Sequence, residues 1–471
     1  MSDKKTTSII LIYLFGAFGG FLFGYDIGII NGALPSIKDT WEITPLMEGT
    51  ITSMLFVGAM LGAVSMAPLA DKFGRKLMIM ATAMIFALGS LACAFSGTPE
   101  ILVVSRLILG VSVGAASALV PMYMGEISPP AIRGRISGLN QLMITIGMLV
   151  SYGINYAFIG VFEGWRWMLG GAIVPAVVLF VGAFILPESP RYLVKKGFKD
   201  KALKSLQKLR SAAEAKSEYE GIIMMHEEVL KSNQKFELTK AISFSIFVGC
   251  SVTFLQQIQG ANTIFYYSSQ ILGDVFGSTI SGVISTIGVG AVMVLATIVT
   301  LFFVDKFKRR TLFMSGSLGM GSSLLIVGLI YPYTQSGYTW AISLVFIFIC
   351  LYVIFYAYSW AAVTWIVVGE LFPGRVRGMA TGIASMVNWF GNIIVALFFP
   401  ILLNSIGLSN IFFMFTALCA VGFLFAKYVL YETNGKTLEE IELYLEKRFN
   451  KNKNAKWTET EPHPSNTGKD I

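Results

Sequence analysis

The sequence predicts an all-α integral membrane protein with twelve transmembrane helices in two six-helix halves. Three observations support this fold class: apolar windows of about 20 residues recur, two loop motifs each occur twice, and lysine and arginine favour alternate loops. The 471 residues are 55% hydrophobic, their mean hydropathy is +0.67, and only 14% are charged. A typical soluble protein carries about 25% charged residues.

Each apolar window ends in charged residues or in proline and glycine, and each is long enough to cross a bilayer as one helix. The first window follows only eight residues and is too long for the core of a signal peptide, which predicts an uncleaved span. The predicted spans are 9–34, 48–70, 78–97, 101–123, 137–160, 165–186, 241–271, 280–304, 312–332, 341–368, 379–403 and 409–431.

The positions of lysine and arginine predict the orientation. Of these 36 residues, all but Lys38, Arg106 and Arg166 lie in the termini, in even-numbered loops or near the membrane ends of those loops. Because positively charged loops stay in the cytoplasm, both termini are predicted to be cytoplasmic. The net charge of +8 then reflects this topology and contact with anionic lipid, and no nucleic-acid partner is expected.

Cysteine and histidine usage argues against a metal site, a cofactor and an enzyme. Cys93, Cys250, Cys350 and Cys419 all fall inside spans without metal-ligand spacing. Neither histidine lies in a span, and no nucleophile–base pattern occurs. The chain contains no N-x-Ser/Thr sequon, which fits a bacterial plasma membrane.

Two motifs in matching order show an internal repeat. Asp71–Lys76 (DKFGRK) returns as Asp305–Arg310 (DKFKRR), an offset of 234 (305 − 71), and Gly125–Gly134 returns as Gly369–Gly378, an offset of 244 (369 − 125). One six-helix half has therefore been duplicated in parallel orientation, as in transporters that bind their ligand between the halves. The predicted parts are an N-terminus at 1–8, bundles at 9–187 and 241–431, a linker at 188–240 and a tail at 432–471, the termini and linker being cytoplasmic.

The charged residues of these motifs, and those that follow span six, are predicted to form a cytoplasmic gate. Their ion pairs would bridge neighbouring helices when the inner side is closed and break when it opens. A role of the basic residues in topology alone is the alternative, but it leaves the acidic partners unexplained. The predicted gate residues are Asp71, Arg75, Glu126, Arg133, Glu188, Arg191, Asp305, Arg309, Glu370 and Arg377.

The linker and the tail are polar. Apolar residues at helical spacing predict short surface helices at Lys199–Leu209 and Glu218–Leu230. His226 lies in this linker, where a solvated histidine is the simplest interpretation. The tail becomes rich in lysine, asparagine and proline, and is predicted to be disordered.

The seventh span differs from the others because amides lie in its middle, where Gln256, Gln257, Gln259 and Asn262 surround Gly260. Hydrocarbon offers amides no partner, and each one left unpaired costs about 1–3 kcal/mol. Gly260 weakens the helix here, which favours backbone beside a cavity. The amides either join neighbouring helices or bind an uncharged ligand with many hydroxyl groups, since amides both donate and accept hydrogen bonds.

Two residues carry charge well inside spans. Asp26 lies about 17 residues into span one, and Arg106 lies about five residues into span four from the other face. At ~1.5 Å per residue both fall in the outer half, so they are predicted to pair. A carboxylate whose arginine partner comes and goes with conformation can bind a proton in one state and release it in another. A static ion pair that locks the two spans is the alternative.

These motifs, in this order and spacing, resemble the sugar porter family of the major facilitator superfamily from about residue 12 to residue 445. The resemblance implies two pseudo-symmetric six-helix bundles that work by alternating access, with a monosaccharide bound between them. The residues and motifs that carry it are Phe21–Asp26 (FLFGYD), Asp71–Lys76, Arg106, Glu126, Pro187–Arg191 (PESPR), Gln256, Gln257, Asn262, Trp365 and Glu370–Pro373 (ELFP).

The resemblance also implies the site. Amides suit sugar hydroxyls, and an indole offers its face to a pyranose ring. Trp365 as a packing residue and Gln141 as a helix–helix contact remain alternatives. The implied sugar-contacting residues are Gln141, Gln256, Gln257, Asn262, Trp365 and Asn388, with Phe23, Tyr266, Met293 and Trp389 lining the pocket.

Asp26 takes the position of the proton-coupling carboxylate of bacterial sugar–proton symporters, where the human facilitative glucose carriers have an amide. The sequence departs from the pattern of the sugar porter family at three places. Met293 replaces an asparagine that reaches the sugar in many relatives, which bears on the substrate. Ala361-Ala362 replaces Gly-Pro and is expected to stiffen span ten, and Lys308 replaces a glycine, and both bear on the rate.

The sequence therefore predicts a monomeric plasma-membrane importer of a neutral monosaccharide, pentose or hexose, coupled to a proton. The alternatives are a sugar uniporter, a myo-inositol transporter of the same fold, and a non-transporting sugar sensor. A sensor is expected to carry a long signalling extension, and about 40 tail residues argue against it.

Overall fold

The computed structural model describes residues 2–129, 133–231, 239–372, 376–435 and 438–449. Within these ranges the regular elements are all helical. Twelve segments of the described chain are long and apolar enough to cross a membrane. The all-α fold class and the twelve predicted spans are therefore confirmed, and most helices extend a few residues beyond the predicted windows.

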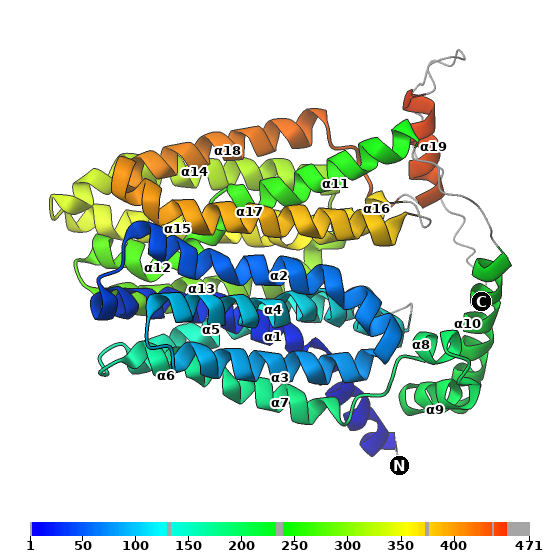
Figure 1. The fold of residues 1–471 in the computed structure, drawn as a ribbon. Helices are drawn as coiled ribbons and strands as arrows, with labels where there is room; N and C mark the ends of the chain where they lie inside the picture. The colour runs from blue at the N-terminus through cyan, green and yellow to red at the C-terminus, as the bar shows by residue number, and fades with distance from the viewer. Residues whose placement is uncertain (1, 130–132, 232–238, 373–375, 436–437, 450–471) are drawn as a thin grey trace.

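The first half carries six spans, and the sixth is broken at Ala172 between two short helices. Figure 1 shows this half as the lower layer of roughly parallel helices. Its elements are α1 (Ser2–Trp41), α2 (Pro45–Phe73), α3 (Arg75–Ala94), α4 (Pro99–Ile127), α5 (Arg133–Phe158), α6 (Gly164–Gly171) and α7 (Ile173–Ala183).

The second half repeats this arrangement, and its first and fourth spans are irregular. Its elements are α11 (Lys240–Ile258), α12 (Ala261–Phe276), α13 (Thr279–Phe303), the 3₁₀ turn η2 (Val304–Lys306), α14 (Arg309–Gln335), α15 (Thr339–Tyr356), the π-helical segment η3 (Ala357–Ala361), α16 (Ala362–Leu371), α17 (Arg377–Ile406) and α18 (Leu408–Tyr428).

Local sequence explains where several of these helices begin. The side chains of Thr44 and Thr98 accept hydrogen bonds from backbone N–H groups in the first turns of α2 and α4. Pro45 and Pro99 follow directly, at the helix position where a missing N–H has no cost.

Glycine allows close helix packing within the first half. A Cβ atom at Gly114 of α4 would lie 1.8 Å from the carbonyl oxygen of Ala59 on α2, so only glycine fits there. Small residues at such contacts let two backbones approach closely, which strengthens the van der Waals packing between helices inside a membrane.

The seventh span is broken at Gly260, where the sequence predicted a weak helix. Gly260 has φ +101°, between the end of α11 and the start of α12. A side chain there would be strained by this backbone conformation and would also meet the ring of Phe415. The break lies among the amides, between Gln259 and Asn262.

Three helices fill the linker: α8 (Pro190–Lys195), α9 (Lys199–Leu209) and α10 (Ala212–Lys231). The predicted helix at Lys199–Leu209 is confirmed with its bounds, and α10 contains the predicted Glu218–Leu230. The side chain of His226 lies outside the described residues. In Figure 1 these helices and the N-terminus lie at one end of the bundle, which we call the linker end, the opposite end being the far end.

The tail contains one helix that the sequence analysis missed, α19 (Leu438–Phe449). It packs on α11 and α16 at the linker end, where Ile441 and Leu445 are buried. Residues beyond 449 lie outside the described part of the chain.

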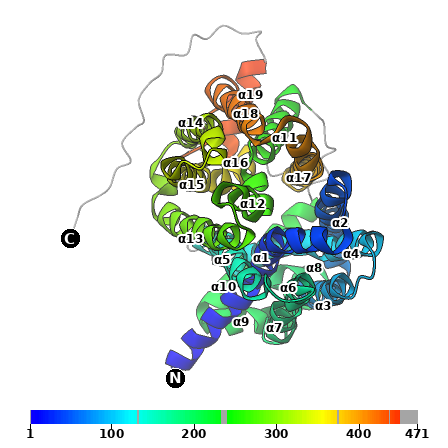
Figure 2. The ribbon, with the colours of Figure 1, turned by 90° about the vertical axis from the view of Figure 1, so that its left-hand side faces the viewer.

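The two halves meet along three helix pairs. α2 packs against α17, α5 against α13 and α1 against α12. In the end-on view of Figure 2, α1 and α2 of the first half border α12 and α17 of the second. This seam contains the residues of the candidate site.

Candidate functional site

Five amide side chains form a connected hydrogen-bond network where α11, α12 and α17 meet. Gln257 and Asn388 both donate to the side-chain oxygen of Gln256, over 3.2 and 3.1 Å. Asn262 donates to Gln257 and, over 2.9 Å, to Asn392. All five are at most 7% exposed, so the break at Gly260 collects polar groups at the seam.

Aromatic rings close the first-half side of this network. Phe23 of α1 meets Trp389 edge-on with 5.6 Å between ring centroids. Phe56 of α2 stacks on both Trp389 and Tyr266, at 6.1 and 5.2 Å. The Tyr266 hydroxyl donates to Asn392 over 2.7 Å, which links these rings to the amides.

The structure thus brings together most of the predicted sugar-binding and pocket-lining residues. Met293 is buried on α13, and Gln141 is half-buried on α5. Trp365 is 41% exposed on α16. These three residues take no part in the hydrogen-bond network of the described residues, and their contact with a sugar stays a prediction.

Gln259 turns away from the other amides. It is fully buried, and within the described residues its side-chain atoms have no hydrogen-bond partner. Its amide nitrogen lies beside Gly422 of α18 instead.

Sequence reasoning missed Asn392 and Phe56. Asn392 follows Asn388 by four residues on α17, so both side chains lie on one helix face. That spacing is a signal that could have found Asn392. Phe56 lies in a uniformly apolar span and carries no such signal.

Span ten is irregular although it lacks the Gly-Pro pair of the family that the sequence resembles. The π-helical segment η3 contains Ala361 and precedes Ala362, whose N–H bonds to Ser359. Ala361-Ala362 therefore does not make span ten a regular helix, and the expected stiffening of this span stays a prediction. π-Bulges of this kind are frequent at functional sites.

The predicted pair of Asp26 and Arg106 is present. Nη1 of Arg106 donates to Oδ1 of Asp26 over 2.8 Å, and the two side chains are 0% and 1% exposed. Nε of Arg106 also donates to the carbonyl of Ile51 on α2. Oδ2 of Asp26 and Nη2 of Arg106 have no partner among the described residues. One oxygen of the carboxylate is therefore without a hydrogen bond among the described residues.

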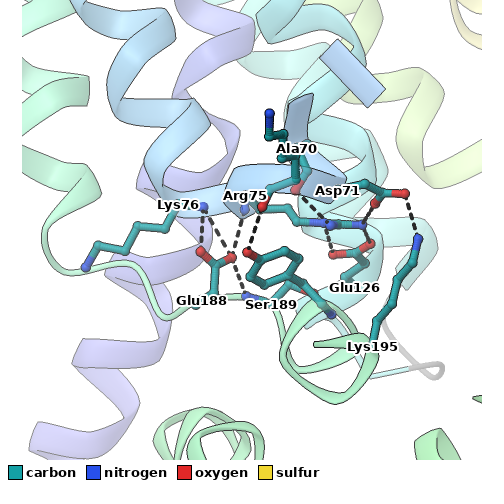
Figure 3. A network of polar contacts seen from close by, with 10 residues as sticks. Ala70, Asp71, Arg75, Lys76, Glu126, Glu188, Ser189 and Lys195 are labelled. Atoms are coloured by element: carbon teal, nitrogen blue, oxygen red, sulfur yellow. Dashed lines mark hydrogen bonds and ion pairs between the residues drawn. The ribbon is translucent and has the colours of Figure 1, made fainter. Parts of the chain in front are cut away.

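At the linker end of the first half, charged residues form the network drawn in Figure 3. Arg75 pairs with Asp71 at 3.0 Å and with Glu126 at 2.9 Å, and Lys195 of α8 pairs with Asp71 at 2.7 Å. The carboxylate of Glu188 accepts from the backbone N–H of Arg75 at the start of α3, over 2.9 Å. Acidic groups at a helix N-terminus are stabilised in this way.

The second half repeats this network. Arg309 pairs with Asp305 at 3.0 Å and with Glu370 at 3.3 Å. Glu432 accepts from the backbone N–H of Arg309 over 2.9 Å, as Glu188 does from Arg75. Glu432 is offset from Glu188 by 244 residues (432 − 188), the same offset as the second motif. The sequence analysis missed this third element of the repeat because only the glutamate is kept.

Every ion pair between the predicted gate residues joins elements of the same half, within the part of the chain that the structure describes. In this conformation they order the linker end of each half and do not tie the halves together. Arg377 bonds to the carbonyl of Phe372, and Arg191 is exposed. The side chain of Arg133 lies outside the described residues.

The family model described as "Sugar (and other) transporter" matches residues 12–445. The chain belongs to this family. It is a multi-pass membrane transporter of the major facilitator fold and not an enzyme.

Two curated relatives and one solved structure are similar to this transporter over nearly its whole length. A D-xylose transporter of Levilactobacillus brevis is 38% identical, covering 92% of this chain and 95% of the relative. Glucose transporter GlcP of Staphylococcus epidermidis is also 38% identical, covering 93% and 97%. The proton:xylose symporter XylE of E. coli, solved with 6-bromo-6-deoxy-D-glucose bound, superposes with a TM-score of 0.77 at 27% identity, covering 94% and 100%.

The halves of this transporter are joined by hydrogen bonds around Asn31 of α1. Its amide donates to the carbonyl of Phe265 over 2.8 Å and to Ser268 over 2.7 Å, and it accepts from the N–H of Ser269 over 2.9 Å. Phe265 and Ser269 are four residues apart on α12, so the amide bonds the two groups that pair in a regular helix. Asn31 of the first half therefore holds α12 of the second half through hydrogen bonds to its backbone and to Ser268.

Asn31→Ala should loosen α12. The substitution removes the three hydrogen bonds that the amide makes to α12, each worth about 0.5–1.5 kcal/mol net, so separation of α1 from α12 should be favoured by at least roughly tenfold. Hydrogen exchange of residues 261–276 should accelerate accordingly. Asn410→Ala is the control, because Asn410 is exposed and its amide donates to the carbonyl of Ile406 at the end of α17, a bond that does not involve α1 or α12. Equal hydrogen-exchange rates of residues 261–276 in both variants would show that Asn31 does not stabilise α12.

Proposed function

We propose that this transporter imports a neutral monosaccharide, a pentose or a hexose, together with a proton. The buried amide network beside Trp389 and Tyr266 is the main observation in favour of a sugar. Five amides without a charged residue among them suit hydroxyl groups, and the neighbouring rings suit the apolar face of a pyranose. The relatives described above transport xylose or glucose by name, which agrees with this substrate class.

Proton coupling is supported by the position of the buried ion pair. Asp26 and Phe23 lie three residues apart on α1, and Phe23 contacts Trp389 of the second half. A change in the pairing of Asp26 with Arg106 can therefore move a helix that touches the sugar site.

In the proposed cycle, a proton reaches Asp26 from outside and weakens its bond to Arg106. Sugar then binds to the amides and draws the halves together around it. The contacts at the far end form while the linker end separates, sugar leaves, and Asp26 releases its proton inside. The linker end faces the cytoplasm in this proposal, with both termini, because its loops carry most of the lysine and arginine. The working unit is a monomer in contact with anionic lipid.

The first test is to measure pH in a lightly buffered suspension of de-energised vesicles that contain the purified protein. Adding the transported sugar outside should make the medium more alkaline, because protons enter with the sugar. Counterflow of labelled sugar without a pH change would instead indicate a uniporter of the same fold. Neither signal with any pentose, hexose or myo-inositol would contradict the substrate class.

A further inference from the structure

Trp360 is fixed behind the amide network by α14. It is 1% exposed, and its indole N–H donates to Oγ of Ser317 over 2.9 Å. Its ring packs edge-on against Phe313, with 4.6 Å between ring centroids. Ser317 and Phe313 are four residues apart on α14 and so present one face to the indole. α14 carries none of the predicted sugar-contacting residues.

The backbone carbonyl of Trp360 orients the amide of Gln256. It accepts from Nε2 of Gln256 over 2.8 Å. Because a carbonyl can only accept, the nitrogen of this amide must face η3 and its oxygen must face the other way. That oxygen is the acceptor for Gln257 and Asn388.

This orientation passes from one amide to the next. Gln257 points its nitrogen at Gln256, so its oxygen faces Asn262, whose nitrogen donates to it. The same nitrogen of Asn262 donates to Oδ1 of Asn392, which also accepts from Tyr266. In each amide, the hydrogen bond to the preceding member of the network fixes which way the nitrogen and the oxygen point. The carbonyl of Trp360 is the first member of this series.

We propose that Trp360, held in place by Ser317, is a positioning residue that fixes which atoms of the amide network donate to the substrate and which accept. No hydrogen bond within the described residues uses Oδ1 of Asn262 or Oδ1 of Asn388 as an acceptor. These two oxygens accept hydrogen bonds from sugar hydroxyls. Nε2 of Gln256 and Nε2 of Gln257 each donate their second hydrogen to the oxygen of a sugar hydroxyl. A sugar matches this pattern only if its hydroxyls have the right configuration. The inference rests on the proposed function, because it takes sugar as the ligand.

Ser317→Ala tests the inference, because it removes the indole's partner without touching the predicted sugar-contacting residues. We expect KM for the preferred sugar to rise about fivefold in counterflow, the range of one lost neutral hydrogen bond, with the maximal rate within about twofold. The ratio of KM values between the preferred sugar and its epimers should fall. Ser317→Thr, which keeps a hydroxyl, should restore both values.

Ser323→Ala is the matched control, since Ser323 is buried on the same helix and, among the described residues, its hydroxyl bonds only to Gly319 of that helix. Trp360→Phe should raise KM as Ser317→Ala does, and the double variant should match either single one, because both remove the same bond. KM and epimer ratios in Ser317→Ala equal to those in Ser323→Ala would overturn the inference while leaving sugar transport intact. Absence of counterflow in the unaltered protein would overturn the proposed function and the inference with it.

Discussion

Replacing Asp26 with asparagine should abolish uphill accumulation of sugar while leaving exchange down a gradient. Asparagine keeps the size of the side chain, and its oxygen can still accept from Arg106 over the present 2.8 Å. It cannot bind and release a proton near neutral pH, so sugar movement is no longer tied to the proton gradient. We expect accumulation to fall from well above the external concentration to equilibration, with exchange of labelled sugar retained.

Asp39→Asn is the matched control for this experiment. Asp39 lies on the same helix and is exposed, so its substitution should leave accumulation unchanged. Uphill accumulation that survives in Asp26→Asn would assign proton coupling elsewhere and reduce the pair with Arg106 to a structural contact.

Arg106→Met should destabilise the protein more than any other single substitution discussed above. It keeps the unbranched stem but leaves the buried carboxylate of Asp26 without its ion-pair partner. Removing one member of a fully buried ion pair costs about 3–5 kcal/mol. The midpoint of thermal unfolding in detergent should therefore fall clearly below that of the unaltered protein.

The double variant Asp26→Asn with Arg106→Met separates the effect of the uncompensated carboxylate from the loss of the other guanidinium contacts. If the uncompensated charge causes the loss, removing both charges should recover most of the stability, since paired sites are not additive. Equal destabilisation of the single and the double variant would show that other contacts of the guanidinium, such as its bond to the carbonyl of Ile51, and not the uncompensated charge of Asp26, account for the loss.

The sequence by itself determined the number of spans and their approximate positions. A stretch of about 20 apolar residues can satisfy its backbone inside lipid only as a helix, so composition alone fixes these elements. It also determined the repeat through the two loop motifs, and the break in span seven through Gly260. The pairing of Asp26 with Arg106 followed from depth, because two isolated charges in one membrane have few other partners.

Apart from the pair of Asp26 and Arg106, only the tertiary structure decided which polar groups meet across the molecule. Asn31 reaches Ser269 over a separation of 238 residues, and Gln256 reaches the carbonyl of Trp360 over 104. Such contacts depend on the angle at which two helices cross and on the face that each presents. No local sequence pattern encodes the crossing angle or the face. If a helix slides by one turn along its neighbour, different polar groups meet, yet the apolar composition of the helix stays the same. The sequence therefore fixed the elements and the chemistry available in them, and packing decided which donors and acceptors remain free for a ligand.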